Sequence, residues 1–245
     1  MRLLAKLTLV ELKLFVREPI SLVFTFAFPL VVLVVLFGVF GSQPDYAFNY
    51  ARPNDYYLAS YVSVVIAAVS LVALPVHVAA YRERGVLRRL RASSVPGVAV
   101  LTAQVLVALV LVTLGSLVLI VAGIVGYDAD LPDQLQPTLV GFALSALAFL
   151  AVGFFLGNVA RTSRAAQAIG MLVFLPMWLL SGAGPPREVL SDTLAFVADL
   201  LPLTYAVRAV QDPWLGLGAN TTALVVMTAM MLLAAVAAVR VVREA

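Results

Sequence analysis

Six long apolar stretches dominate this sequence of 245 residues and limit what the chain can fold into. A helix needs about 20 apolar residues to cross the hydrocarbon core of a bilayer, where backbone polar groups must pair within the segment. The stretches contain almost no ionisable residues and show no strand-type alternation. The sequence therefore predicts an all-α polytopic membrane protein with six transmembrane helices, over residues 20–41, 57–80, 98–125, 138–160, 165–181 and 221–239.

The composition excludes other classes of protein. Hydrophobic residues make up 63% of the chain and charged residues 12%, with a mean hydropathy of +1.05, whereas ordinary soluble domains carry about 25% charged residues. The chain has no Cys, its single His cannot build a metal site alone, and a net charge of +3 does not indicate nucleic acid. We expect one membrane domain over residues 1–245, with no catalytic, cofactor or metal site.

The distribution of basic residues predicts the orientation. Thirteen of the sixteen Lys and Arg residues fall before the first stretch, between the second and third, between the fourth and fifth, or after the sixth. The opposite side holds Arg52, Arg187 and Arg208. Loops rich in Lys and Arg remain in the cytoplasm, so we predict that both termini are cytoplasmic.

Residues 1–19 have the pattern of a helix that lies in the membrane surface. Helical periodicity puts four basic residues within an arc of about 60°, with Leu and Val over much of the remaining surface. Pro19 then turns the chain into the first span. The alternative is a charge cluster that only sets topology. The basic residues of this expected interfacial helix are Arg2, Lys6, Lys13 and Arg17.

Residues 81–96 form a short, highly charged cytoplasmic loop. Apolar residues 86, 87 and 90 would lie on one face of a short helix, with arginines around them that suit an acidic or hydrogen-bonding partner. A solvated charge run is the alternative reading. The pattern favours a docking helix, whose key residues are Arg82, Glu83, Arg84, Gly85, Leu87, Arg88 and Leu90.

Residues 182–218 lie on the opposite side and are too apolar for a free loop. Their periodicity predicts two short helices, interrupted at Pro202, that dip back into the outer leaflet. Asp199 and Arg208 lie nine residues apart across this break, and we expect them to pair. Exchanging both charges should then restore what single changes lose.

No energy-coupling or hydrolytic motif is present in the sequence. It contains no phosphate-binding loop, no nucleophile elbow and no His-Glu-x-x-His zinc helix. His77 is the one titratable candidate, other than tyrosine, within the spans, and we interpret it as a polar residue near the interface. Gly153-x-x-x-Gly157 permits close helix contact but is a common pattern. Uphill transport by this chain would therefore need energy from another protein.

Taken together, the features resemble the ABC-2 family, the membrane subunits of bacterial ATP-binding-cassette exporters. The loop Glu83-Arg84-Gly85-x-Leu87-x-x-Leu90 and the order of the interfacial helix and spans are similar to that family. So is the segment 201–205 around Pro202 and Tyr205, followed by Arg208 and Gln211, which resembles a C-terminal family signature. The family more often has Ser or Thr directly before Pro96, where this chain has Val95.

The resemblance implies a permease of the compact drug- and antibiotic-export type in the bacterial cell membrane. It would work with two ATPase subunits, which bind ATP and Mg²⁺, and with a second copy or a homologous permease. Residues 81–96 would be the coupling helix, and Pro202, Tyr205, Arg208 and Gln211 an outer gate. The cargo would be hydrophobic or amphiphilic. A polysaccharide or lipid exporter, and a non-transporting membrane scaffold, are the alternatives.

Overall fold

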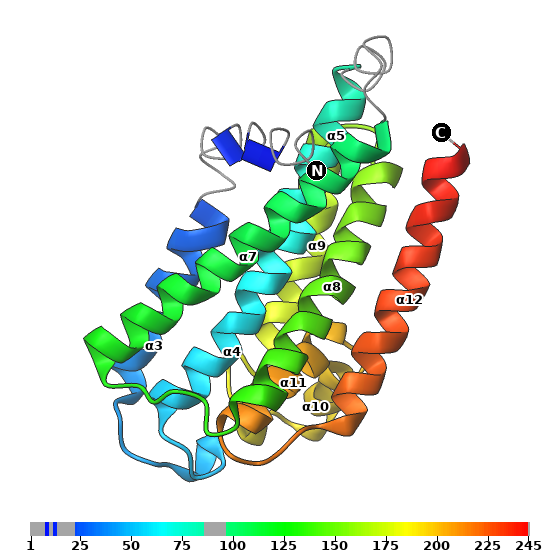
Figure 1. The fold of residues 1–245 in the computed structure, drawn as a ribbon. Helices are drawn as coiled ribbons and strands as arrows, with labels where there is room; N and C mark the ends of the chain where they lie inside the picture. The colour runs from blue at the N-terminus through cyan, green and yellow to red at the C-terminus, as the bar shows by residue number, and fades with distance from the viewer. Residues whose placement is uncertain (1–7, 10–11, 14–22, 86–96, 245) are drawn as a thin grey trace.

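The computed structural model describes residues 8–9, 12–13, 23–85 and 97–244, and there the chain forms a bundle of long helices joined by short turns (Figure 1). Every regular element in these ranges is a helix, which confirms the all-α prediction. The long outer helices are α7 (Gly97–Tyr127), α8 (Leu135–Val159), α9 (Ser163–Leu180) and α12 (Thr221–Glu244).

One nearly continuous helical segment forms the centre of the bundle. It consists of α4 (Pro53–Ala68), the π turn η3 (Val69–Ala73) and α5 (Leu74–Glu83). Every residue of α4 and η3 is buried, because α3, α7, α8, α9 and α11 all pack around this segment. It corresponds to the expected second span.

A proline follows each of the two π turns by two residues. The first π turn, η1 (Val23–Ala27), precedes Pro29 in α3 (Phe28–Phe40), and η3 precedes Pro75 in α5. Proline has no N–H and its ring clashes with the carbonyl four residues earlier, so a wider turn relieves the clash. Neither Ser70 nor Leu71 can therefore receive a hydrogen bond from position 75.

Two glycines of neighbouring helices lie against these carbonyl groups. A Cβ atom at Gly153 of α8 would collide with the Ser70 carbonyl oxygen, and one at Gly170 of α9 with that of Leu71. A third glycine, Gly157, lies against Pro75. The absence of side chains thus lets α8 and α9 approach the backbone of the central segment.

The remaining faces of the outer helices are apolar and exposed, as a bilayer requires. Leu172 of α9 is 75% exposed and Leu233 of α12 is 73% exposed. Within the described residues, five helices are long and apolar enough to cross a membrane, or six if the bent pair α10–α11 is one span. The expected first span corresponds to η1 and the 13-residue α3, and positions 20–22 lie outside the described residues.

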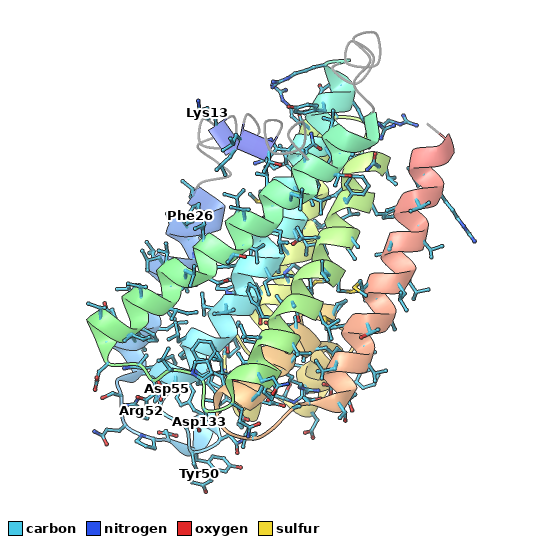
Figure 2. All side chains as sticks on the ribbon, viewed as in Figure 1. Lys13, Phe26, Tyr50, Arg52, Asp55 and Asp133 are labelled. Atoms are coloured by element: carbon cyan, nitrogen blue, oxygen red, sulfur yellow. The ribbon has the colours of Figure 1, made fainter. Side chains whose placement is uncertain are left out.

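Figure 1 shows the start of α7, the end of α8, the start of α9 and the end of α12 at one end of the bundle. We call this the inner end, following the predicted orientation, and the opposite one the outer end. There Arg52, before α4, donates from Nε to Asp55 Oδ2 at 2.8 Å and from Nη2 to Asp130 Oδ2 at 2.6 Å. The contact with Asp130 connects the α7–α8 turn to the central helix. Figure 2 shows Arg52 and Asp55 close to each other at this end of the bundle.

Candidate functional site

A sharp bend between two short helices closes the outer end of the bundle. Helix α10 (Asp192–Asp199) and helix α11 (Pro202–Trp214) meet at 90°. Leu201 is extended, with φ −92° and ψ 127°, because the residue before a proline avoids helical geometry. Pro202 then begins α11, where a missing N–H costs nothing.

Two hydrogen bonds hold this bend. The hydroxyl of Thr204 donates to the Ala198 carbonyl oxygen at 2.6 Å, and the hydroxyl of Tyr205 donates to that of Asp199 at 2.8 Å. Both acceptors belong to the last turn of α10, where helical carbonyl groups lack partners within the helix. The bend is therefore a defined local structure built by residues of α11.

Asp199 lies between two arginines beside this bend. Its Oδ1 accepts a hydrogen bond from Arg208 Nη2 at 2.8 Å, which confirms the predicted pair. Its Oδ2 accepts one from Arg187 Nη2 at 2.6 Å, a contact that sequence reasoning missed. Arg187 belongs to the 3-10 turn η4 (Arg187–Val189), twelve residues before Asp199. Arg208 also lies 5.7 Å from the ring centroid of Tyr205.

Gln211 joins α11 to the central helix. Its side chain is buried, and Nε2 donates to Ser60 Oγ at 2.7 Å and to the Tyr56 carbonyl oxygen at 3.1 Å. Ser63 adds a bond of 3.0 Å to the Ala206 carbonyl oxygen. These polar contacts are well shielded from water, so their loss would leave buried groups unpaired.

A polar cavity of about 250 Å³ lies beneath these contacts at the outer end. Its lining comes from the ends of α9 and α4, from η4, from α11 and from the turn before α12. The charged residues of the lining are Arg187, Glu188, Arg208 and Asp212. Asp212 accepts a hydrogen bond of 2.7 Å from Asn220. The cavity offers hydrogen-bond donors and acceptors of both charges to a polar group.

The four residues predicted for an outer gate are all on α11. Pro202 begins the helix, Tyr205 and Arg208 contact Asp199, and Arg208 and Gln211 line the cavity. Their spacing puts 205, 208 and 211 within two turns of one helix. The structure therefore brings them together, while Arg187, Glu188 and Asp212 complete the charged lining of the cavity.

At the inner end, Glu83 joins the last turn of α5 to the first turn of α9. Its Oε2 accepts hydrogen bonds from the backbone N and the Oγ of Ser163, each at 2.9 Å. Thr162 Oγ1 caps the same helix by accepting from Ala165 N at 3.1 Å. Glu83, which the sequence predicts to contact a partner protein, thus has a partner within this chain.

The rest of the predicted inner surface is only partly described. Arg82 lies in the last turn of α5, Arg84 is the C-cap residue, and Gly85 has a φ of 65° that suits the residue after a helix. Leu12 and Lys13 are both described, and both are helical. The other predicted residues, Leu87, Arg88, Leu90, Arg2, Lys6 and Arg17, lie outside the described residues.

Within the described ranges, no group of three or more His, Asp or Glu side chains could hold a metal ion. His77 lines a small cavity of about 20 Å³ between α5 and α7, together with the buried Gln104. That volume has room for about one water molecule, so it does not suit a cargo molecule.

Apolar outer helices around a central segment that is buried throughout α4 and η3, with a polar cavity at one end, define a polytopic helical membrane protein. A family model described as "ABC-2 type transporter" matches residues 2–213. The chain belongs to the ABC-2 type transporter family.

Two curated relatives are similar to part of this chain. The inner membrane transport permease YhhJ of Escherichia coli (strain K12) is 32% identical over 96 residues, and the protein of that name from Shigella flexneri has the same identity. The match covers 39% of this chain and 25% of each relative. This chain therefore matches about a quarter of the length of these relatives.

Proposed function

We propose that this chain is the membrane permease subunit of an ATP-binding-cassette exporter in a bacterial cell membrane. It works with two separate ATPase subunits that hydrolyse ATP with Mg²⁺, and it pairs with a second copy or a homologous permease. The cargo is a hydrophobic or amphiphilic molecule, of the drug, antibiotic or lipid-like type. The family match over residues 2–213 carries this proposal.

The contact of Glu83 with Ser163 supports a coupling role for the inner end. Glu83 lies near the start of residues 81–96, which we propose to be the surface that docks onto the ATPase. A push on this loop reaches α9 directly, because Glu83 binds the first turn of that helix at 2.9 Å. Movement of the ATPase pair would thus move α5 and α9 together.

The bend at Pro202 supports a gate at the outer end. Asp199 binds both Arg187 and Arg208 beside the bend, and these two arginines also line the polar cavity. We propose that the α10–α11 pair lies at the depth of the outer leaflet and that it moves when cargo leaves. ATP drives the change only if it binds the two conformations with different affinity.

The polar lining of the outer cavity favours a second candidate within the same family. Both signs of charge and the amides of Gln211 and Asn220 suit hydroxyl-rich or zwitterionic groups better than purely apolar cargo. A polysaccharide or lipid exporter permease would use such a lining. A membrane scaffold that transports nothing would have no need for it.

Reconstitution tests the proposed function. The full chain is placed in vesicles with and without the ATPase that co-purifies with it, and the ATP-dependent movement of a lipophilic fluorescent dye and of a fluorescent phospholipid is measured. We expect movement only with the ATPase and ATP. Uphill movement by the chain alone would contradict the proposal, and co-purification without any ATPase would favour the scaffold.

A further inference from the structure

An apolar groove runs along the membrane-facing side of the inner half of the bundle. It encloses about 500 Å³ between α7, α8 and α12, and Thr102 is the one polar residue of its lining. On α8 the lining extends from Leu147 to Phe154, about 10 Å at 1.5 Å per residue. The groove therefore covers roughly a third of a hydrocarbon core that is about 30 Å thick.

A run of small residues on α12 explains the groove. Residues 234–238 read Ala-Ala-Val-Ala-Ala, and Ala235 and Ala238 form one wall. Figure 1 shows α12 apart from α7, with α8 between them. Alanine side chains are too short to reach across this space to Leu101 and Val105 of α7. An apolar space of this size does not stay empty in a close-packed structure.

The inner end of the groove lies beside a basic residue. Arg240 directly follows Val239 of the lining and is exposed. It begins about 1.5 Å from Val239 along the helix axis. A basic residue at this depth attracts anionic lipid head groups.

We propose that the groove binds one acyl chain of an anionic phospholipid of the cytoplasmic leaflet, whose phosphate lies beside Arg240. The apolar lining suits the acyl chain, and the positive charge of Arg240, nearer to the cytoplasm, suits the phosphate. A second copy of the chain is the other occupant that the test distinguishes. The inference is independent of what the chain transports.

Native mass spectrometry of the full chain in mild detergent tests the site. The probes are phosphatidylglycerol and phosphatidylcholine with identical acyl chains. We expect one phosphatidylglycerol to be retained per chain, about tenfold more than phosphatidylcholine. Ala238→Phe fills the groove and should lower the retention of both lipids about tenfold, because the contacts of two methylene groups are lost. Arg240→Gln should remove the preference for phosphatidylglycerol over phosphatidylcholine and leave the retention of phosphatidylcholine unchanged.

Matched controls separate the groove from general lipid contact. Leu172→Phe adds bulk on the exposed face of α9, and Arg164→Gln removes an exposed charge at the start of α9, away from the groove; both should leave retention unchanged. If Ala238→Phe fails to fold, a phosphatidylglycerol with a photoreactive acyl chain should label α7, α8 and α12 in the unmodified protein. Equal retention of both lipids, labelling confined to other helices, or disulfide-linked chains from Ala238→Cys would overturn the proposal.

Discussion

Asp199 binds two arginines that come from different elements, Arg187 of η4 and Arg208 of α11. Its loss would therefore break two contacts, whereas the loss of either arginine would break one. Its side chain is 38% exposed and those of Arg187 and Arg208 are 33% and 26% exposed. Partly exposed ion pairs contribute little individually, about 0.5 kcal/mol each, but one carboxylate that serves two arginines loses both contacts at once. The three residues therefore form one unit.

Replacing Asp199 should weaken the outer end more than replacing either arginine. We expect Asp199→Asn to lower the apparent melting temperature in detergent by more than Arg187→Gln or Arg208→Gln, with an effect of about 1 kcal/mol. Exchanging only Asp199 and Arg208 should not restore stability, because the new arginine would lie beside Arg187. Changing Arg187 to Asp as well should restore it. Full recovery by the two-residue exchange would show that Arg187 does not take part.

At the scale of elements, the packing of α8 and α9 on the central segment depends on two contacts, each between a glycine and a backbone carbonyl group. Pro75 widens the turn at η3, and Gly153 and Gly170 let α8 and α9 pack against Ser70 and Leu71. Close approach also brings glycine Cα–H groups near the carbonyl oxygens, a weak but favourable contact. The packing of three helices thus depends on residues without side chains.

A methyl group at Gly153 should disturb this packing. We expect Gly153→Ala to cost about 2 kcal/mol, because the Ser70 backbone cannot move away without repacking the central helix. The measurement is the apparent melting temperature in detergent. Gly38→Ala, a helical glycine of α3 with open space around it, is the matched control and should be neutral or slightly stabilising. Equal behaviour of the two variants would contradict the packing argument.

The link between α5 and α9 can be tested in the same way. Glu83→Ala should lower both the thermal stability of the chain and its recovery with the ATPase. Glu83→Gln should keep part of both, because an amide oxygen can still accept from Ser163. Arg161→Gln, at an exposed arginine of the α8–α9 turn outside the proposed docking loop, is the control. If Glu83→Ala reduces recovery with the ATPase and leaves stability unchanged, Glu83 acts on the partner protein alone.

The sequence predicted the helices well because apolar stretches of this length have few other solutions. It also predicted the Asp199–Arg208 pair, since both residues flank a proline break. Arg187 was missed because its distance from Asp199 depends on the path of the chain through η4. The partner of Gly170 was likewise not predictable, since only the packed bundle places Leu71 beside it.

At the scale of the whole molecule, the two ends differ in chemistry. The outer end has ion pairs between its own side chains and a polar cavity, whereas the inner end carries most of the basic residues. The predicted orientation places the outer end on the periplasmic or external side of the membrane and the inner end on the cytoplasmic side. The proposed gate and the proposed docking loop then lie on opposite sides of the membrane.

Single cysteines test this orientation, since the natural chain has none. Leu131→Cys, in the exposed α7–α8 turn, should react with a membrane-impermeant maleimide added to intact cells. Arg161→Cys, in the exposed α8–α9 turn, should react only after the membrane is opened. Both replaced positions lie outside the ion pairs described above. Labelling of both residues from the same side would overturn the topology and the positions of gate and docking loop.

The wide turn at η3 holds about one residue more than an ordinary helical turn, so it keeps the two halves of the central segment in nearly the same rotational phase. Removing one residue from 69–73 would restore ordinary winding, at about 100° per residue, and would rotate the residues beyond it very little. Glu83 would then still face Ser163, and the bonds of α4 to Gln211 would stay in place. A one-residue deletion within α4 should instead rotate everything beyond it by about 100° and break the contact of Glu83 with Ser163.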